Sequence, residues 1–356
     1  MTTNRYSMYT PLTRKVAKTL QIAPQLRAKL VQHGVATLAH VHDLSVQVAR
    51  MEALALSLPE QQILKNAVES LATIERTTFQ SDVCVIPPMG MVLDPAESPE
   101  LMRRRTDSVI EKRTLAEYAE SLKPLLPHQH LLTNYMQPVR NQGYLGSCTG
   151  FGSVNTREYL TGLALSPGYA YRGAKRLDGY PQLEGSWQEF AFEFMVRHGA
   201  VLESEYPYCD CLDEKPIDEL LDSAGMFKIK GYIDLLVEAK HLSTVLKAAL
   251  SGQLLPDFPP RPVAISVATY DSFCDRSSFL TGVIPVPTVA ETRRGGHAMS
   301  VCGYTRLYGV DYFVVINSWG TQFAKESPLG LPGYALIPEA YINQPGLVCE
   351  LLMPFE

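Results

Sequence analysis

The sequence lacks long apolar runs, strongly basic stretches and an apolar N-terminal core, and each absence argues against a class of protein. No apolar run approaches the ~20 residues that a membrane-spanning helix needs, so no transmembrane helix is predicted. The 32 basic residues are outnumbered by 37 acidic ones, which gives a formal net charge of -5. No stretch is basic enough to indicate a nucleic-acid-binding surface. The polar start, Met1 to Pro11, lacks the apolar core of a secretory signal peptide.

Cysteines are also few and do not form a disulfide or metal framework. The seven cysteines cannot all pair within one chain: they are Cys84, Cys148, Cys209, Cys211, Cys274, Cys302 and Cys349. Cys209 and Cys211 are one residue apart, too close for the usual zinc spacing, and no second pair exists, so we interpret them as loop residues. We therefore predict no metal and no cofactor. A reducing compartment is favoured, which predicts a cytoplasmic location, or export without a classical signal peptide.

The chain has enough apolar sequence to fold into more than one unit. Hydrophobic residues make up 46% of 356 residues, and single cores rarely grow past ~250 to 300 residues. Residues 1–76 are predicted to form a small helical unit, with amphipathic runs between residues 12 and 73. The turn around Gly34 is typical of a helix-hairpin-helix. Its residues 32–37 include no lysine or arginine, so a protein partner or internal packing is favoured over DNA.

A linker or propeptide-like segment is predicted for residues 77–125. Val85 to Leu93 is apolar but broken by prolines and a glycine, so it is expected to be extended. Glu111 to Leu125 suits a charged, exposed helix. Two roles stay open for the apolar segment: it covers a cleft in the downstream domain, or it packs the helical unit onto that domain.

The stretch from Pro138 to Gly152 carries the first chemical signal. Gly143 and Gly146 indicate a tight turn, and Ser147 is a good N-cap for a helix that begins at Cys148. Unpaired N–H groups at a helix N-terminus favour a thiolate, which is the nucleophilic form of cysteine. The Cys148 N–H and the Gln142 side chain are candidates to stabilise an oxyanion. The alternative is that Cys148 is simply a small buried hydrophobe.

Two later segments favour the catalytic interpretation. Two glycines precede His297, and an apolar run follows it, which places the imidazole at the start of a predicted strand. A second apolar run ends in Asn317-Ser318-Trp319-Gly320. A cysteine, a histidine and an asparagine in this order form the nucleophile, base and orienting residue of a thiol protease.

These three segments together resemble the motifs of the papain family of cysteine peptidases. The resemblance implies that Cys148 is the nucleophile, His297 the general base and acid, Asn317 the residue that orients the imidazole, and Gln142 the oxyanion-hole side chain. It also implies that Trp319 shields the histidine and asparagine from water. Two positions depart from the family: Leu145 replaces a disulfide cysteine of secreted members, and Thr149 replaces the usual tryptophan.

The resemblance also implies a fold and a substrate cleft. Residues 126–356 are expected to form the papain-like domain, an α+β fold with a helical lobe before a strand-rich lobe. Glu184-Gly185-Ser186 resembles the glycine-rich wall that pairs with the substrate backbone. The other expected substrate-binding residues are Gly146, Ser147, Gly296 and Trp319.

The function predicted from the sequence is hydrolysis of protein or peptide amide bonds by an endopeptidase, kept inactive by its own N-terminal region. Three alternatives stay open. An acyl transferase or deamidase would use the same thiol chemistry with a different acceptor. A pseudoenzyme would use the fold only for binding, and a third possibility is a chain that acts mainly by interaction through residues 12–73.

Overall fold

The computed structural model describes residues 17–18, 20–32, 41, 51, 54–67, 109–180, 183–255 and 258–356. In the N-terminal part, helix α2 (Pro24–Gln32) contributes Leu26 and Leu30 to a small apolar cluster of its own. The glycine turn predicted at Gly34 and the apolar segment Val85 to Leu93 lie outside the described residues.

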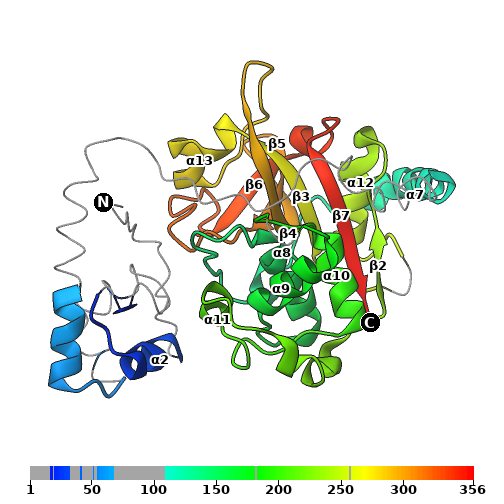
Figure 1. The fold of residues 1–356 in the computed structure, drawn as a ribbon. Helices are drawn as coiled ribbons and strands as arrows, with labels where there is room; N and C mark the ends of the chain where they lie inside the picture. The colour runs from blue at the N-terminus through cyan, green and yellow to red at the C-terminus, as the bar shows by residue number, and fades with distance from the viewer. Residues whose placement is uncertain are drawn as a thin grey trace.

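A single antiparallel sheet runs through the larger part of the molecule (Figure 1). Its strand order is β2-β7-β3-β4-β5-β6, and the short strand β1 pairs with β4. The strands are β1 (His130–Leu131), β2 (Gly231–Asp234), β3 (Val263–Tyr270), β4 (Arg293–Leu307), β5 (Val310–Ile316), β6 (Tyr334–Pro338) and β7 (Val348–Phe355).

Most helices of this part precede the main strands in the chain. They are α7 (Val109–Leu122), α8 (Cys148–Thr161), α9 (Pro167–Leu177), α10 (Gln188–Arg197), α11 (Tyr208–Leu212), α12 (Ala239–Leu250), α13 (Arg276–Thr281) and α14 (Glu339–Ile342). Helices α8, α9 and α10 pack together beside the sheet (Figure 1). A helical lobe followed by a strand-rich lobe confirms the predicted α+β class.

The sheet buries apolar side chains on both faces, as strand β3 illustrates. Successive side chains of a strand point to opposite faces. Val263, Ile265 and Val267 therefore join the core that α12 covers, whereas Ala264 joins the core beneath α8, α9 and α10. Because both faces are covered, the central strands are almost continuously buried, and the β4 segment that carries the histidine is rigidly placed.

Helix α7 is more than the exposed helix expected from its charges. Its residue Ala119 is fully buried in the core shared with α12, and Leu115 and Leu122 pack against the same core. The face that carries Arg113 is exposed. The division of the chain into domains stays a prediction, but this packing ties residues 109–122 to the peptidase-like fold.

The interpretation of Cys209 and Cys211 as loop residues is wrong. Both lie in the short helix α11 and are buried. The reason is a close helix contact: a Cβ on Gly168 of α9 would lie 2.5 Å from the Cys211 Cβ, so only a glycine lets α11 approach this closely.

Within the described ranges no helix is long and apolar enough to cross a bilayer.

Candidate active site

Cys148 is the first residue of helix α8, and its side chain is fully buried. Ser147 occupies the N-cap position as predicted, but the prediction that its side chain caps the helix is wrong, because it makes no capping hydrogen bond. Its hydroxyl is hydrogen-bonded to the Tyr208 hydroxyl instead. The first-turn N–H groups of α8 surround the thiol and favour negative charge there.

A glycine allows helix α8 to lie directly on strand β4. A Cβ on Gly152 would lie 3.0 Å from both the N and the O of Met299, so a larger residue would push the two elements apart. The Ser300 hydroxyl donates to the Gly152 carbonyl at 2.6 Å. At the same interface the Ala298 N–H donates to the Cys148 Sγ at 3.4 Å. The nucleophile segment and the histidine segment, far apart in sequence, therefore meet at the start of α8.

The sequence predicted that His297 lies at the start of a strand. That prediction is wrong, because His297 lies within strand β4. The strand begins at Arg293 and continues through Gly296, because β3 pairs with it along this whole length. The His297 Nε2 lies 2.7 Å from the Asn317 Oδ1, just beyond the end of β5. Its Nδ1 is buried and makes no hydrogen bond within the described residues. Asn317 thus holds one ring nitrogen, and the other is the nitrogen that would exchange a proton if His297 is the base that the sequence predicts.

Trp319 covers the histidine. The indole and imidazole rings stack with centroids 4.7 Å apart and an interplanar angle of 29°. Phe273 contacts both rings edge-on. Burial lowers the pKa of His297 to about 4, although the hydrogen bond to Asn317 opposes this shift. At neutral pH the imidazole is therefore uncharged in this state of the protein.

We expect this buried histidine to make the protein less stable in acid. The pKa of about 4 in the folded chain is below the ~6.5 of an exposed histidine. Between these pH values the unfolded chain binds more protons, so stability rises with pH and falls by about 3 kcal/mol from pH 7 to pH 4. Urea unfolding of wild type and His297→Gln at a series of pH values measures this contribution. Identical pH dependence in the two proteins contradicts it.

Gln142 is tied to both lobes. Its Nε2 donates to the Leu145 carbonyl at 2.9 Å, and its Oε1 accepts from the Ser318 hydroxyl at 2.6 Å. The Ser318 N–H in turn donates to the Asn317 Oδ1 at 2.7 Å. The predicted oxyanion residue and the residue that orients the histidine thus share one hydrogen-bond network.

The predicted substrate-binding wall approaches the nucleophile loop at one point. The Gly146 N–H donates to the Glu184 carboxylate at 3.3 Å, and Glu184 is exposed. The Ser186 side chain turns away from this point, because its buried hydroxyl donates to Asp178 at 2.9 Å. Gly185 adopts a φ of 89°, a conformation that favours glycine. Gly185 is buried, its N–H donates to the Tyr171 hydroxyl and its carbonyl accepts from Lys175, so Glu184 is the exposed residue of the predicted wall.

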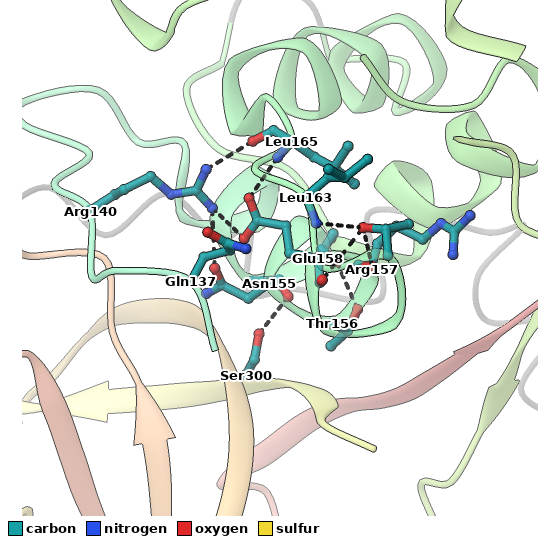
Figure 2. Close-up of polar contacts among 12 residues, drawn as sticks. Gln137, Arg140, Asn155, Thr156, Arg157, Glu158, Leu163, Leu165 and Ser300 are labelled. Carbon is teal, nitrogen blue, oxygen red and sulfur yellow. Dashed lines mark hydrogen bonds and ion pairs between the residues drawn. The ribbon is translucent and has the colours of Figure 1, made fainter. Parts of the chain in front are cut away.

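A buried ionic group that sequence reasoning missed supports the loop before Gln142 (Figure 2). The Arg140 guanidinium donates to the Glu158 carboxylate at 2.8 Å, to the Leu165 carbonyl at 2.8 Å and to the Asn155 side chain at 3.2 Å. Glu158 also accepts the Leu165 N–H at 2.8 Å. The network joins the middle of α8 to the chain segment that leads into the candidate oxyanion residue.

The same segment is fixed on its other side by the asparagine motif. The Gly320 N–H donates to the Arg140 carbonyl at 3.0 Å, and the Gln142 N–H donates to the Ser318 carbonyl at 2.8 Å. Residues 140–142 therefore pair with residues 318–320. The sequence signal for this pair was limited to two opposite charges, Arg140 inside the nucleophile segment and Glu158 beyond its end.

Comparison with known proteins gives consistent results. The model of the papain family of cysteine proteases matches residues 129–337. The low-temperature-induced cysteine proteinase of Solanum lycopersicum is 26% identical over 52% of this chain and 49% of its own length. A KDEL-tailed cysteine endopeptidase of Arabidopsis thaliana is 26% identical over 60% of this chain and 54% of its own. The chain spans about half the length of the curated relatives it matches.

One solved structure supports the fold. The crystal structure of xylellain, a cysteine protease from Xylella fastidiosa, superposes with a TM-score of 0.55 over 65% of this chain and 86% of that one, at 23% identity.

In the parts of the chain that the structure describes, no group of three or more histidine, cysteine, aspartate or glutamate residues could hold a metal ion.

The expectation of a cytoplasmic location is wrong. The matched relatives are plant and parasite proteinases, and one of them is KDEL-tailed. A KDEL tail is a retention address of the endoplasmic reticulum, so these relatives give no support to a cytoplasmic protein. The expectation rested on an odd thiol count and on Leu145 in place of a disulfide cysteine. A single lost crosslink removes one constraint from the fold and does not determine the compartment.

Proposed function

This chain belongs to the papain family of cysteine proteases, and from that membership we propose that it hydrolyses amide bonds of proteins or peptides through a thioester on Cys148. One observation carries the proposal. The His297 Nε2 lies 2.7 Å from the Asn317 Oδ1, while the next residue, Ala298, donates to the Cys148 Sγ. Nucleophile, base and orienting amide come from three distant segments, and such an arrangement is what thiol-dependent acyl transfer requires.

The acylation step follows from these positions. The Cys148 Sγ attacks the carbonyl carbon of the scissile bond, and its proton moves to the His297 Nδ1. The same proton then passes to the amide nitrogen, the C–N bond breaks, and the amine product leaves a thioester on Cys148. Asn317 accepts from the Nε2–H throughout, and this keeps the Nδ1 as the reactive nitrogen.

Deacylation runs in the opposite sense with water. The His297 Nδ1 takes a proton from a water molecule, and the oxygen attacks the thioester carbonyl. The C–S bond breaks, the acid product leaves, and the proton returns to the Cys148 sulfur. In both steps the Cys148 N–H and the Gln142 amide are proposed to stabilise the oxyanion.

A cleavage profile tests the proposed reaction. Reduced protein is incubated with a peptide library, with Cys148→Ala as the blank, and products are identified by mass spectrometry. An endopeptidase gives internal cuts and free carboxylic acids. If an added amine is incorporated in place of water as the main product, the chain is an acyl transferase. If the reduced protein forms no more product than the blank, the result favours the alternative that the chain is a pseudoenzyme.

We further propose that the N-terminal region restrains the enzyme, and one observation supports this. The Arg27 guanidinium of α2 forms an ion pair with Asp213 at 2.5 Å, with the two side chains only 8% and 7% exposed. Residue 213 follows α11, whose Tyr208 contacts the nucleophile loop.

Removal of this region is expected to raise the rate on a small fluorogenic peptide by about tenfold or more, because a tethered segment acts at a high effective concentration. The comparison uses residues 1–356 and residues 106–356, which keep α7 and its packing on α12. Both proteins are first shown to be folded by circular dichroism. In the full chain, Arg27→Gln is expected to give part of the increase, whereas Arg113→Gln, at an exposed site on α7, gives none.

Equal rates for the long and short chains, with no cleavage between Thr77 and Leu125 during activation, would contradict this restraint. Residues 77–108 would then be better explained as a packing element. The proposed peptidase activity would be unaffected by that result.

A further inference from the structure

Tyr208 reaches into the candidate site from outside the three motifs. It is the first residue of α11, and its ring is buried beside the nucleophile helix. Its hydroxyl donates to the Gln142 carbonyl at 2.7 Å and is also hydrogen-bonded to the Ser147 hydroxyl. A phenol has a single hydrogen. Since that hydrogen goes to Gln142, the Ser147 hydroxyl donates in the second bond, which is much shorter than its 3.4 Å contact with the Leu145 carbonyl.

These two contacts join the ends of the nucleophile loop. Gln142 carries the side chain proposed for the oxyanion hole, and Ser147 immediately precedes the Cys148 N–H, the other proposed donor. The loop between them is a turn in which Gly143 has a φ of 65°. A bridge across its ends limits how far the two donors can separate.

The ring that carries the hydroxyl is itself held in place. Phe151, on the first turns of α8, packs edge-on against it with centroids 4.8 Å apart and an interplanar angle of 70°. Burial raises the pKa of Tyr208 well above its ordinary value. The phenol is therefore protonated and able to donate at neutral pH.

We propose that Tyr208 is a positioning residue for the oxyanion hole, which acts by holding the Gln142 and Ser147 ends of the nucleophile loop at a fixed separation. This inference rests on the proposed function. Oxyanion donors must lie about 2.7–3.1 Å from the oxygen that becomes charged. A loop free to widen at Gln142 would meet this requirement only part of the time, while the thiol and imidazole would be unchanged.

The test is Tyr208→Phe, which removes the hydroxyl and keeps the ring. The matched control is Tyr206→Phe, which removes a hydroxyl that donates to the Lys215 carbonyl at 2.5 Å, outside the nucleophile loop. Outright loss of an oxyanion donor costs ~10²–10³ in kcat, so a loosened donor is expected to cost about tenfold. KM is expected to stay within about twofold, and Tyr206→Phe to keep the wild-type kcat.

Two inhibitors separate positioning from general damage. A peptide aldehyde forms a hemithioacetal whose oxygen occupies the oxyanion hole, so its affinity is expected to fall in Tyr208→Phe by about the same factor as kcat. Iodoacetamide alkylates the thiol without forming an oxyanion, so its rate on Cys148 is expected to be unchanged. Both are measured in the full chain under conditions where circular dichroism shows all variants folded.

Several outcomes would overturn the inference. The first is a kcat and an aldehyde affinity in Tyr208→Phe that equal those of wild type. The second is a loss of kcat in Tyr206→Phe as large as that in Tyr208→Phe. The third is slower alkylation of Cys148 by iodoacetamide in Tyr208→Phe than in wild type. A wild-type protein that hydrolyses no peptide would instead refute the proposed function. The aldehyde affinities of the two variants would still decide whether Tyr208 positions the loop.

Discussion

Replacement of Cys148 by alanine is expected to lower kcat by about 10⁴ or more, to the level of the residual catalysis that binding and the oxyanion donors supply. His297→Ala is expected to lose as much, because nucleophile and base act as one unit. Asn317→Ala is expected to weaken turnover less, since the amide orients the imidazole but exchanges no proton. Hydrolysis of a fluorogenic peptide by the folded, reduced variants measures all three.

A second buried thiol supplies the matched control for the first prediction. Cys302 lies on the same strand as His297, is fully buried, and donates to the Val314 carbonyl at 3.4 Å. Cys302→Ala is therefore expected to keep the wild-type kcat, although it removes a thiol of similar burial. Retained hydrolysis in Cys148→Ala would refute the assignment of the nucleophile.

Arg140→Met is expected to lower the free energy of unfolding by about 3–5 kcal/mol at pH 7, because it leaves the Glu158 carboxylate buried without its partner. Burial raises the pKa of Glu158, and Arg140 opposes that rise. Without Arg140 the carboxyl takes up a proton more readily, so the loss is expected to shrink as the pH falls and the group becomes neutral. Urea unfolding at pH 7 and pH 5 measures the cost and its pH dependence.

The controls for this prediction use the same chain. Glu158→Gln is expected to cost less than Arg140→Met, since Arg140 is partly exposed and can be hydrated. The double variant should recover part of the loss, which a double-mutant cycle quantifies. Arg113→Met breaks an exposed pair on α7 and should have little effect. A small cost for Arg140→Met that does not depend on pH would show that the buried pair does not support the fold.

The candidate site could be predicted from the sequence because thiol catalysis needs fixed residue types. Gln142 and Cys148 stand six residues apart before a helix, and His297 and Asn317 each adjoin an apolar run that proved to be a strand. In each case the local pattern agreed with the tertiary environment.

Features that depend on distant contacts could not be predicted. Strand β4 extends back to Arg293 because β3 pairs with it, and no local pattern reveals that partner. Helix α11 packs closely against α9, and this contact is possible because residue 168 of α9 is a glycine. The partners of Tyr208 are a carbonyl and a hydroxyl some 60 residues earlier. Such contacts are determined by packing, and a single sequence does not record them.

We expect Cys148, activated by His297, to be the thiol that performs the hydrolysis. The most direct measurement is to treat the reduced protein with a peptidyl epoxide, to follow peptide hydrolysis in parallel, and to locate the adduct by peptide mapping. We expect one adduct per chain, on Cys148, formed in step with the loss of activity and strongly slowed in His297→Ala. Hydrolysis that persists in a chain fully labelled at Cys148, or an adduct confined to the partly exposed Cys349 while activity is lost, would contradict it.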